Sequence, residues 1–252
     1  MKRWFLFSVI IFSLFYPLQG IHAGEYENAE IIQVYKEDVT GDGKKDKITL
    51  KGIRFEPNAA FWKVVWAEID SATGQTFRIK YEPGYDPEIQ FVDLIHNGVP
   101  QLFESSATGG SGGFYTYNLS SLKQEKQQEI SLPTLVVEGS FQDNYRAVIT
   151  IPATKESYHL NLTDRKKDYD RLGLYYNGKL NEPTELMIPP IAYFQVVQSI
   201  DGKEGPGLRG YQQISGAYHA DAIGTVQSTW YYENNEWQLL DVTFNSYEKK
   251  KN

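Results

Sequence analysis

Apolar and polar side chains alternate over short runs along most of the chain, a pattern typical of half-buried β-strands. These runs are rich in Val, Ile, Thr, Tyr, Phe and Trp, and Gly, Pro, Asn or Asp residues separate them. The predicted strands span residues 31–35, 47–51, 61–69, 76–81, 101–105, 114–118, 134–141, 145–151, 158–162, 192–200, 225–232 and 236–242. The only stretch with weak helical character, residues 119–129, is charged in its second half and is predicted to be a solvated connection. The sequence therefore predicts an all-β protein.

The N-terminus has the features of a secretory signal peptide. Lys2 and Arg3 provide a positive start, an uncharged apolar run follows at residues 4–16, and Pro17 ends that run. A membrane-spanning helix needs about 20 apolar residues, so a membrane anchor is the less favoured interpretation. Ala23 provides a small residue for cleavage. We therefore expect removal of residues 1–23 and a mature chain that is secreted or associated with the cell envelope, with no membrane span.

Composition narrows the class of protein further. The chain contains 41% hydrophobic and 14% aromatic residues, which is enough for a core, and residues 24–252 are predicted to form a single all-β repeat domain. It has no Cys and therefore no disulfide or thiolate metal site. The formal net charge of −7 argues against nucleic acid as a partner, because a duplex requires a basic face.

One motif has the ligand spacing of a wrapped calcium loop. Its first, third, fifth, seventh and ninth positions are Asp38, Thr40, Asp42, Lys44 and Asp46, with Lys44 offering its backbone carbonyl. The twelfth position lacks the bidentate Glu of an EF-hand and both flanks are predicted strands, so the motif is expected to be a loop between strands. We expect a structural, weakly bound Ca²⁺ here. The alternative is a plain hairpin turn, since the central Asp-Gly pair forms one without any ion.

This motif, followed by Ile-Thr-Leu, resembles the calcium-loop repeat of FG-GAP and VCBS-type proteins. A second copy lies 55 residues further on, with Asp93, Asn97, Gly98 and Gln101 at the matching positions, and it lacks most of the carboxylates. Weaker matches to the loop motif occur at residues 143–144 and 200–203. The resemblance implies a β-propeller-like fold or a repeated antiparallel β-meander with degenerate calcium-loop repeats. The chain also resembles uncharacterised exported VCBS repeat-containing proteins of Gram-positive spore-formers, through residues 109–113 and 216–221.

Other candidate catalytic residues give weaker signals. Ser111 sits in a Gly-x-Ser-x-Gly pattern, but a strand is predicted after it where a nucleophile elbow requires a helix. The three His residues of the mature chain lie far apart in sequence, at positions 96, 159 and 219, and zinc requires more ligands than such isolated residues provide. Glu68, Glu104 and Glu138 interrupt apolar strands, and they are either paired carboxylates of a hydrolase or residues that point to solvent.

Aromatic clusters offer a different kind of site. They occur at residues 61–66, 114–117 and 230–237, and they form either sugar-binding platforms or parts of the core. The sequence favours an exported, calcium-stabilised β-repeat protein with a binding or structural role, whose ligand is a cell-envelope component, a carbohydrate or a protein. The alternative is a secreted hydrolase that uses paired carboxylates. A deep pocket with convergent polar groups would favour the hydrolase, and a shallow surface with exposed aromatic rings would favour binding.

Overall fold

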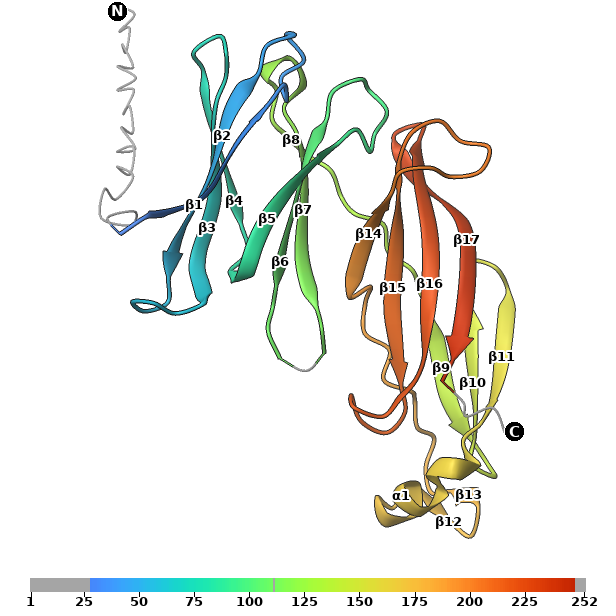
Figure 1. The fold of residues 1–252 in the computed structure, drawn as a ribbon. Helices are drawn as coiled ribbons and strands as arrows, with labels where there is room; N and C mark the ends of the chain where they lie inside the picture. The colour runs from blue at the N-terminus through green and yellow to red at the C-terminus, as the bar shows by residue number, and fades with distance from the viewer. Residues whose placement is uncertain (1–27, 111, 248–252) are drawn as a thin grey trace, which may run out of the picture.

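The computed structural model describes residues 28–110 and 112–247 of the chain, so the predicted signal peptide and Ser111 lie outside the described residues. The first half forms an eight-stranded antiparallel sheet, drawn from blue to green in Figure 1. Its strands are β1 (Glu30–Glu37), β2 (Asp46–Arg54), β3 (Phe61–Asp70), β4 (Thr76–Tyr81), β5 (Gly84–Val92), β6 (Gln101–Ala107), β7 (Tyr115–Ser121) and β8 (Gln128–Glu129), with a short 3-10 turn at Lys123–Glu125 before β8.

The strands of this sheet form two successive meanders. Strands β1 to β4 pair in chain order, and strands β5 to β8 do the same. A short pairing of β3 with β5, at Phe61 with Tyr85 and Trp62 with Gly84, joins the two meanders. The sequence motifs at 38–46 and 93–101 therefore both connect the first and second strands of a meander.

Alternation along the strands explains the core of the first meander. Ile48 and Leu50 of β2 are completely buried, and so are Val65 and Ile69 of β3. They pack in one apolar cluster with residues of β4, β5 and β6. Each fully buried aliphatic side chain contributes about 1.5–3 kcal/mol to stability, so this cluster is a major source of the stability of the first half.

The second half contains two larger sheets and a small helical insertion. The three-stranded sheet has the order β11-β10-β9, and the four-stranded sheet has the order β14-β15-β16-β17. The insertion between them holds a 3-10 turn, one short helix and a two-stranded hairpin. The bounds are β9 (Glu138–Gln142), β10 (Arg146–Ile151), β11 (Glu156–Asn161), the 3-10 turn (Thr163–Arg165), α1 (Lys166–Arg171), β12 (Tyr175–Tyr176), β13 (Lys179–Leu180), β14 (Tyr193–Val197), β15 (Gly207–Ser215), β16 (Ala222–Glu233) and β17 (Glu236–Ser246).

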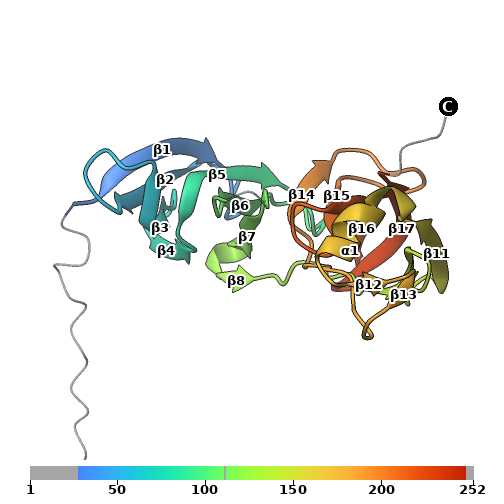
Figure 2. The same cartoon turned by 90° about the horizontal axis from the view of Figure 1, so that it is seen from below.

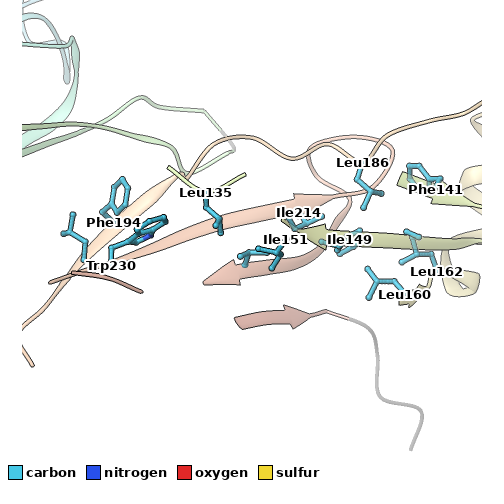
Figure 3. Packing of buried hydrophobic residues seen from close by; sticks show 14 of the residues in the cluster. Leu135, Phe141, Ile149, Ile151, Leu160, Leu162, Leu186, Phe194, Ile214 and Trp230 are labelled. Carbon is cyan, nitrogen blue, oxygen red and sulfur yellow. The ribbon is translucent and has the colours of Figure 1, made fainter. Parts of the chain in front are cut away.

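The two sheets of the second half share one apolar core, shown in Figure 3. Phe141, Ile149 and Leu160 belong to the three-stranded sheet, and Ile214 and Trp230 belong to the four-stranded sheet. Large apolar side chains on one face of each sheet thus cover each other. None of the helices in the described ranges is long and apolar enough to cross a lipid bilayer.

The two halves lie side by side along the long axis of the molecule and meet through buried contacts (Figures 1 and 2). The core of the second half includes Leu94 and Phe103 from the first half. The Tyr117 hydroxyl of β7 accepts a hydrogen bond from the Phe194 backbone N–H of β14 at 2.9 Å. His96 bridges the halves as well, because its Nδ1 lies 3.0 Å from the Tyr232 carbonyl oxygen and its Nε2 lies 2.8 Å from that of Pro206.

The structure confirms the predicted all-β class, and no sheet among the described residues closes on itself. The prediction missed β5 and β15, and two of its other details were wrong. Residues 119–129 are not a wholly solvated connection, because Leu119 and Leu122 are buried with exposures of 1% and 0%. Residues 134–137 are not part of the strand predicted there, since β9 begins at Glu138.

Candidate functional site

The loop predicted to bind calcium is closed by hydrogen bonds from its own backbone. Asp38 accepts the Gly41 N–H through Oδ1 at 2.6 Å and the Gly43 N–H through Oδ2 at 2.8 Å. Asp46 is 1% exposed, and its carboxylate accepts the backbone N–H groups of Val39 at 3.0 Å, Thr40 at 3.1 Å and, from outside the loop, Ala72 at 3.0 Å. The carboxylates at the two ends of the motif therefore satisfy backbone donors that would otherwise lack a partner.

The other predicted ligands follow the same principle. Asp42 Oδ1 accepts the Lys44 N–H at 2.8 Å, and the Thr40 hydroxyl lies 3.5 Å from Asp46 Oδ1. Within the described ranges, no three or more acidic or His side chains are grouped so that they could hold a metal ion. The loop carboxylates accept backbone N–H groups in this arrangement, and calcium at this loop stays a prediction.

The second copy of the motif forms a loop with closely matching hydrogen bonds. Asp93 accepts the Asn97 N–H at 3.0 Å and the Gly98 N–H at 2.8 Å, and Asn97 Oδ1 accepts the Val99 N–H at 3.0 Å. Gln101, at the position of Asp46, accepts the Ile95 N–H through Oε1 at 3.1 Å. An amide oxygen thus replaces a carboxylate without loss of the turn, so closing the second loop depends on oxygen acceptors rather than on charge.

The remaining sequence candidates are not brought together. His96 binds two backbone carbonyls at the junction of the halves, whereas His159 and His219 are exposed on separate segments. Glu138 is exposed at the start of β9, and Glu68 forms ion pairs with Lys51 and Arg78. Glu104 differs from these residues because it is buried, and it lines a separate cleft described below.

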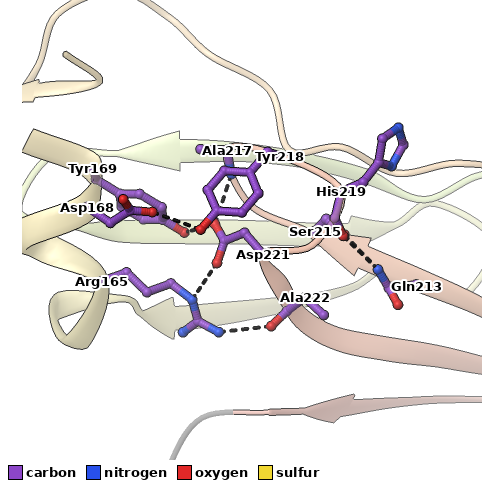
Figure 4. A network of polar contacts seen from close by, with 10 residues as sticks. All are labelled: Arg165, Asp168, Tyr169, Gln213, Ser215, Ala217, Tyr218, His219, Asp221 and Ala222. Carbon is purple, nitrogen blue, oxygen red and sulfur yellow. Dashed lines mark hydrogen bonds and ion pairs between the residues drawn. The ribbon is translucent and has the colours of Figure 1, made fainter. Parts of the chain in front are cut away.

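The 216–221 segment anchors the helical insertion to the four-stranded sheet (Figure 4). Asp221 is 8% exposed, and Arg165 Nε donates to its Oδ1 at 2.8 Å. The Tyr169 hydroxyl of α1 donates to Asp221 Oδ2 at 2.6 Å, and the Ala217 backbone N–H donates to the same oxygen at 3.0 Å. The carboxylate has three donors from two different segments, so its role is to hold these segments together.

A shallow groove on the outer face of the four-stranded sheet has the features of a binding site. Successive strand residues point to opposite faces, so Phe194, Ile214 and Val226 enter the core while their neighbours Tyr193 and Gln213 line the outer face. The groove has a volume of about 380 Å³. We call it the tyrosine groove, and its side chains are Tyr193, Tyr211, Gln213, Thr225, Gln227, Asn245 and Tyr247, with Gly112 and Ala192 completing its lining.

Strand register explains why these side chains meet. Tyr193 pairs with Tyr211, which pairs with Gln227 on the next strand. The adjacent row pairs Gln213, Thr225 and Asn245 in the same manner. Two neighbouring cross-strand rows thus form one aromatic and amide-rich surface.

Aromatic rings in and beside the groove remain exposed. Tyr193 is 42% exposed and Tyr247 is 51% exposed, while Tyr115 of β7 extends the surface at 39% exposure. The ring centroids of Tyr193 and Tyr211 are 5.8 Å apart, and those of Tyr115 and Tyr193 are 5.6 Å apart. Ring packing of this kind holds the side chains in defined orientations before any ligand arrives.

Hydrogen-bonding groups of the groove are neutral. The Tyr211 hydroxyl donates to Gln195 Oε1 at 2.9 Å, and Gln213 Nε2 donates to the His219 carbonyl oxygen at 3.0 Å. None of the described residues that line the groove carries a charge. The surface therefore offers aromatic faces, amides and hydroxyls, which suit an uncharged polar ligand.

Sequence reasoning found only the edge of this groove. Tyr115 belongs to a cluster singled out in the sequence, but residues of the other clusters such as Trp62, Trp66 and Trp230 are buried in the core. Tyr211 and Gln213 were missed because β15 was not predicted. The sequence signal for β15 was weak, because its buried positions include Gly210 and Gln212 as well as Leu208 and Ile214.

This geometry defines the class of the protein. It is an all-β protein of two joined halves, with a neutral aromatic groove on its C-terminal sheet. A family model described as the YybI C-terminal domain matches residues 135–245, which contain both sheets of the second half. The chain is 30% identical over 208 residues to "Uncharacterized protein YybI" of Bacillus subtilis (strain 168), and this alignment covers 79% of the chain and 78% of that protein. The chain belongs to the YybI family. No solved structure matches it.

Proposed function

We propose that this protein is an exported binding protein whose tyrosine groove holds a neutral carbohydrate of the cell envelope. The single observation that carries the proposal is a shallow, uncharged groove lined by tyrosine rings, with amide and hydroxyl groups beside them. Sugar rings present both apolar C–H faces and many hydroxyl groups, so they need flat aromatic surfaces and neutral hydrogen-bonding partners together. Tyrosine provides both at a small entropic cost, because its side chain has few rotatable bonds.

Two further features support the location and architecture in this proposal. The N-terminal pattern of Lys2, Arg3 and an apolar run supports export, and sequencing the N-terminus of the secreted form should find it near Gly24. The successive meanders and their matching loops support two degenerate repeats of the FG-GAP or VCBS type in the first half. Weak calcium binding at the first loop belongs to the same proposal.

The experiment is a titration of the mature protein with two neutral oligosaccharides, cellohexaose and N-acetylglucosamine hexamer, followed by NMR or calorimetry. Tyr193→Ala and Tyr247→Ala should each weaken binding about tenfold, which corresponds to about 1.4 kcal/mol. Tyr176→Ala is the matched control, because Tyr176 is 72% exposed and lies on β12, outside the groove. Binding that survives both groove substitutions, or no binding by the unaltered protein, would contradict the proposal.

The same mixtures distinguish binding from hydrolysis. A hydrolase would shorten the oligosaccharides during a long incubation, whereas a binding protein would leave them intact. Chromatography of the products therefore tests the alternative function predicted from the acidic residues.

A further inference from the structure

A second cavity lies in the first half of the protein, apart from the tyrosine groove. We call it the Glu104 cleft, and its volume is about 330 Å³. It lies between the end of β4 and strands β6, β7 and β8, that is, between the two meanders. The residues on which the argument depends are Lys80, Tyr81, Glu82, Glu104, Asn118 and Glu129.

The sheet buries Glu104 because β6 is covered on both faces. Phe103 packs in the core of the second half, while Leu102 packs in the core of the first meander, on the same side as Glu104. Glu104 is 1% exposed, and the Ser106 hydroxyl donates to its Oε1 at 2.6 Å. Burial raises the pKa of Glu104 to about 8, with a smaller lowering by Ser106 and a further increase from the negative charge of Glu82. The carboxyl group therefore keeps its proton at neutral pH as long as no cation is nearby.

Tyr81 provides an independent sign that the cleft accepts a ligand. Its side chain is 8% exposed, and its hydroxyl group has no hydrogen-bond partner among the described residues. Burial, and to a smaller extent the negative charge of Glu104 when it is ionised, raise the pKa of Tyr81 well above its usual value. Buried hydroxyl groups in native proteins almost always have a partner, so the Tyr81 hydroxyl is available to a group that enters the cleft.

The charges around the cleft select a cation. Glu82, Glu104 and Glu129 line the cleft together with one basic residue, Lys80. Tyr117 also borders the cleft, but its side chain lies on the opposite face of β7, against Phe103 and Phe194. A calcium ion needs six to eight converging oxygens, whereas the described residues contain no group of three acidic or His side chains suited to a metal. An ammonium group has three donors, which fit a few separate oxygen acceptors, and the Tyr81 ring suits its aliphatic chain and charge.

We propose that the Glu104 cleft binds a primary ammonium group carried on an aliphatic chain, and that Glu104 and Tyr81 provide its hydrogen-bond acceptors. The proton of Glu104 leaves for the solvent when the cation enters, because the bound ammonium stabilises the carboxylate. Binding and proton release are thus coupled, and the cleft discriminates cations from neutral alcohols of equal length.

Calorimetry of the mature protein with 1,5-diaminopentane tests this inference, with 1-pentanol as the neutral probe. A peptide Gly-Lys-Gly distinguishes a lysine side chain from a free amine as the source of the ammonium group. With a carboxyl pKa of about 8, the affinity for the cation should rise roughly 25-fold between pH 6.5 and pH 8.5. At pH 6.5, titrations in two buffers of different ionisation enthalpy should show close to one proton released for each cation bound.

The variants make the test specific. Glu104→Gln should abolish both the proton release and the pH dependence, and Tyr81→Phe should weaken binding at both pH values. Glu138→Gln replaces an exposed carboxyl group in the other half and should change neither the affinity for the amine nor its pH dependence. The inference would be overturned by absence of amine binding, by equal binding of 1-pentanol, by an unchanged pH dependence in Glu104→Gln, or by Ca²⁺ replacing the amine with the same pH dependence.

Discussion

Glu104 should make the stability of the protein depend on pH in the opposite sense to most carboxylates. In the unfolded chain a Glu ionises near pH 4.5, but in the folded protein burial keeps this one protonated up to about pH 8. The folded state therefore binds the proton more tightly. The stabilising effect of this proton is complete below pH 4.5 and is lost as the pH rises from 4.5 to 8.

The magnitude follows from the two pKa values. Their difference of about 3.5 corresponds to about 5 kcal/mol of unfolding free energy. Glu104→Gln keeps the shape of the side chain and the acceptor for the Ser106 hydroxyl, but it carries no titrating proton. The variant should therefore match the unaltered protein at pH 4.5 and exceed its stability by several kcal/mol at pH 8.5.

Urea denaturation of both proteins at a series of pH values from 4.5 to 8.5 measures this difference. Trp62 and Trp66 of β3 report on the half that contains Glu104 through their fluorescence. The difference between the two proteins cancels the titration of all other groups. If that difference stays constant across the range, the Glu104 carboxyl ionises normally and its burial has no electrostatic consequence.

Three further predictions concern the loops and the helical insertion. Asp46→Ala should lower the unfolding free energy by about 3 kcal/mol or more in urea denaturation, because its buried carboxylate accepts three backbone N–H groups. Gln101→Ala should cost less, because the neutral amide accepts one backbone N–H and donates to one backbone carbonyl; equal losses would contradict this. Calcium at about 10 mM should raise the melting temperature by roughly 3–6 °C if the loop binds it with a millimolar Kd, and Asp42→Ala should remove this increase. If calcium does not raise the melting temperature, backbone hydrogen bonds alone hold the loop. Asp221→Ala should cost about 3–5 kcal/mol, since Arg165 loses its buried partner, and a loss below about 1 kcal/mol would refute the anchoring role.

Strand prediction succeeded where side chains alternate and failed where Gly or Pro interrupts the pattern. Strand β4 was predicted with the bounds that the structure shows, Thr76–Tyr81. Strand β5 was missed because Pro87 lies within it, and the structure accommodates this residue at a register shift between Tyr85 and Glu88. Strand β15 was missed because Gly207 and Gly210 weaken the strand pattern.

The two candidate sites differ in how much of each could be predicted from the sequence. Glu104 was singled out from its apolar surroundings, but its burial depends on cores that cover both faces of β6 and come from distant segments. The tyrosine groove combines side chains of four strands, from Tyr193 of β14 to Asn245 of β17, with Tyr247 after the last strand and Gly112 from the first half. A single strand shows which residues share a face, but not which strand lies beside it.

The sequence by itself determined the β class, most strand positions and the two related loops, because alternation and turn residues act over a few neighbouring positions. Only the tertiary structure decided what the acidic loop residues contact, which aromatic rings stay exposed and which carboxyl group is buried away from solvent. These properties depend on strand pairing and on the packing of the sheets. Such contacts join residues far apart in the chain, so local patterns contain no information about them.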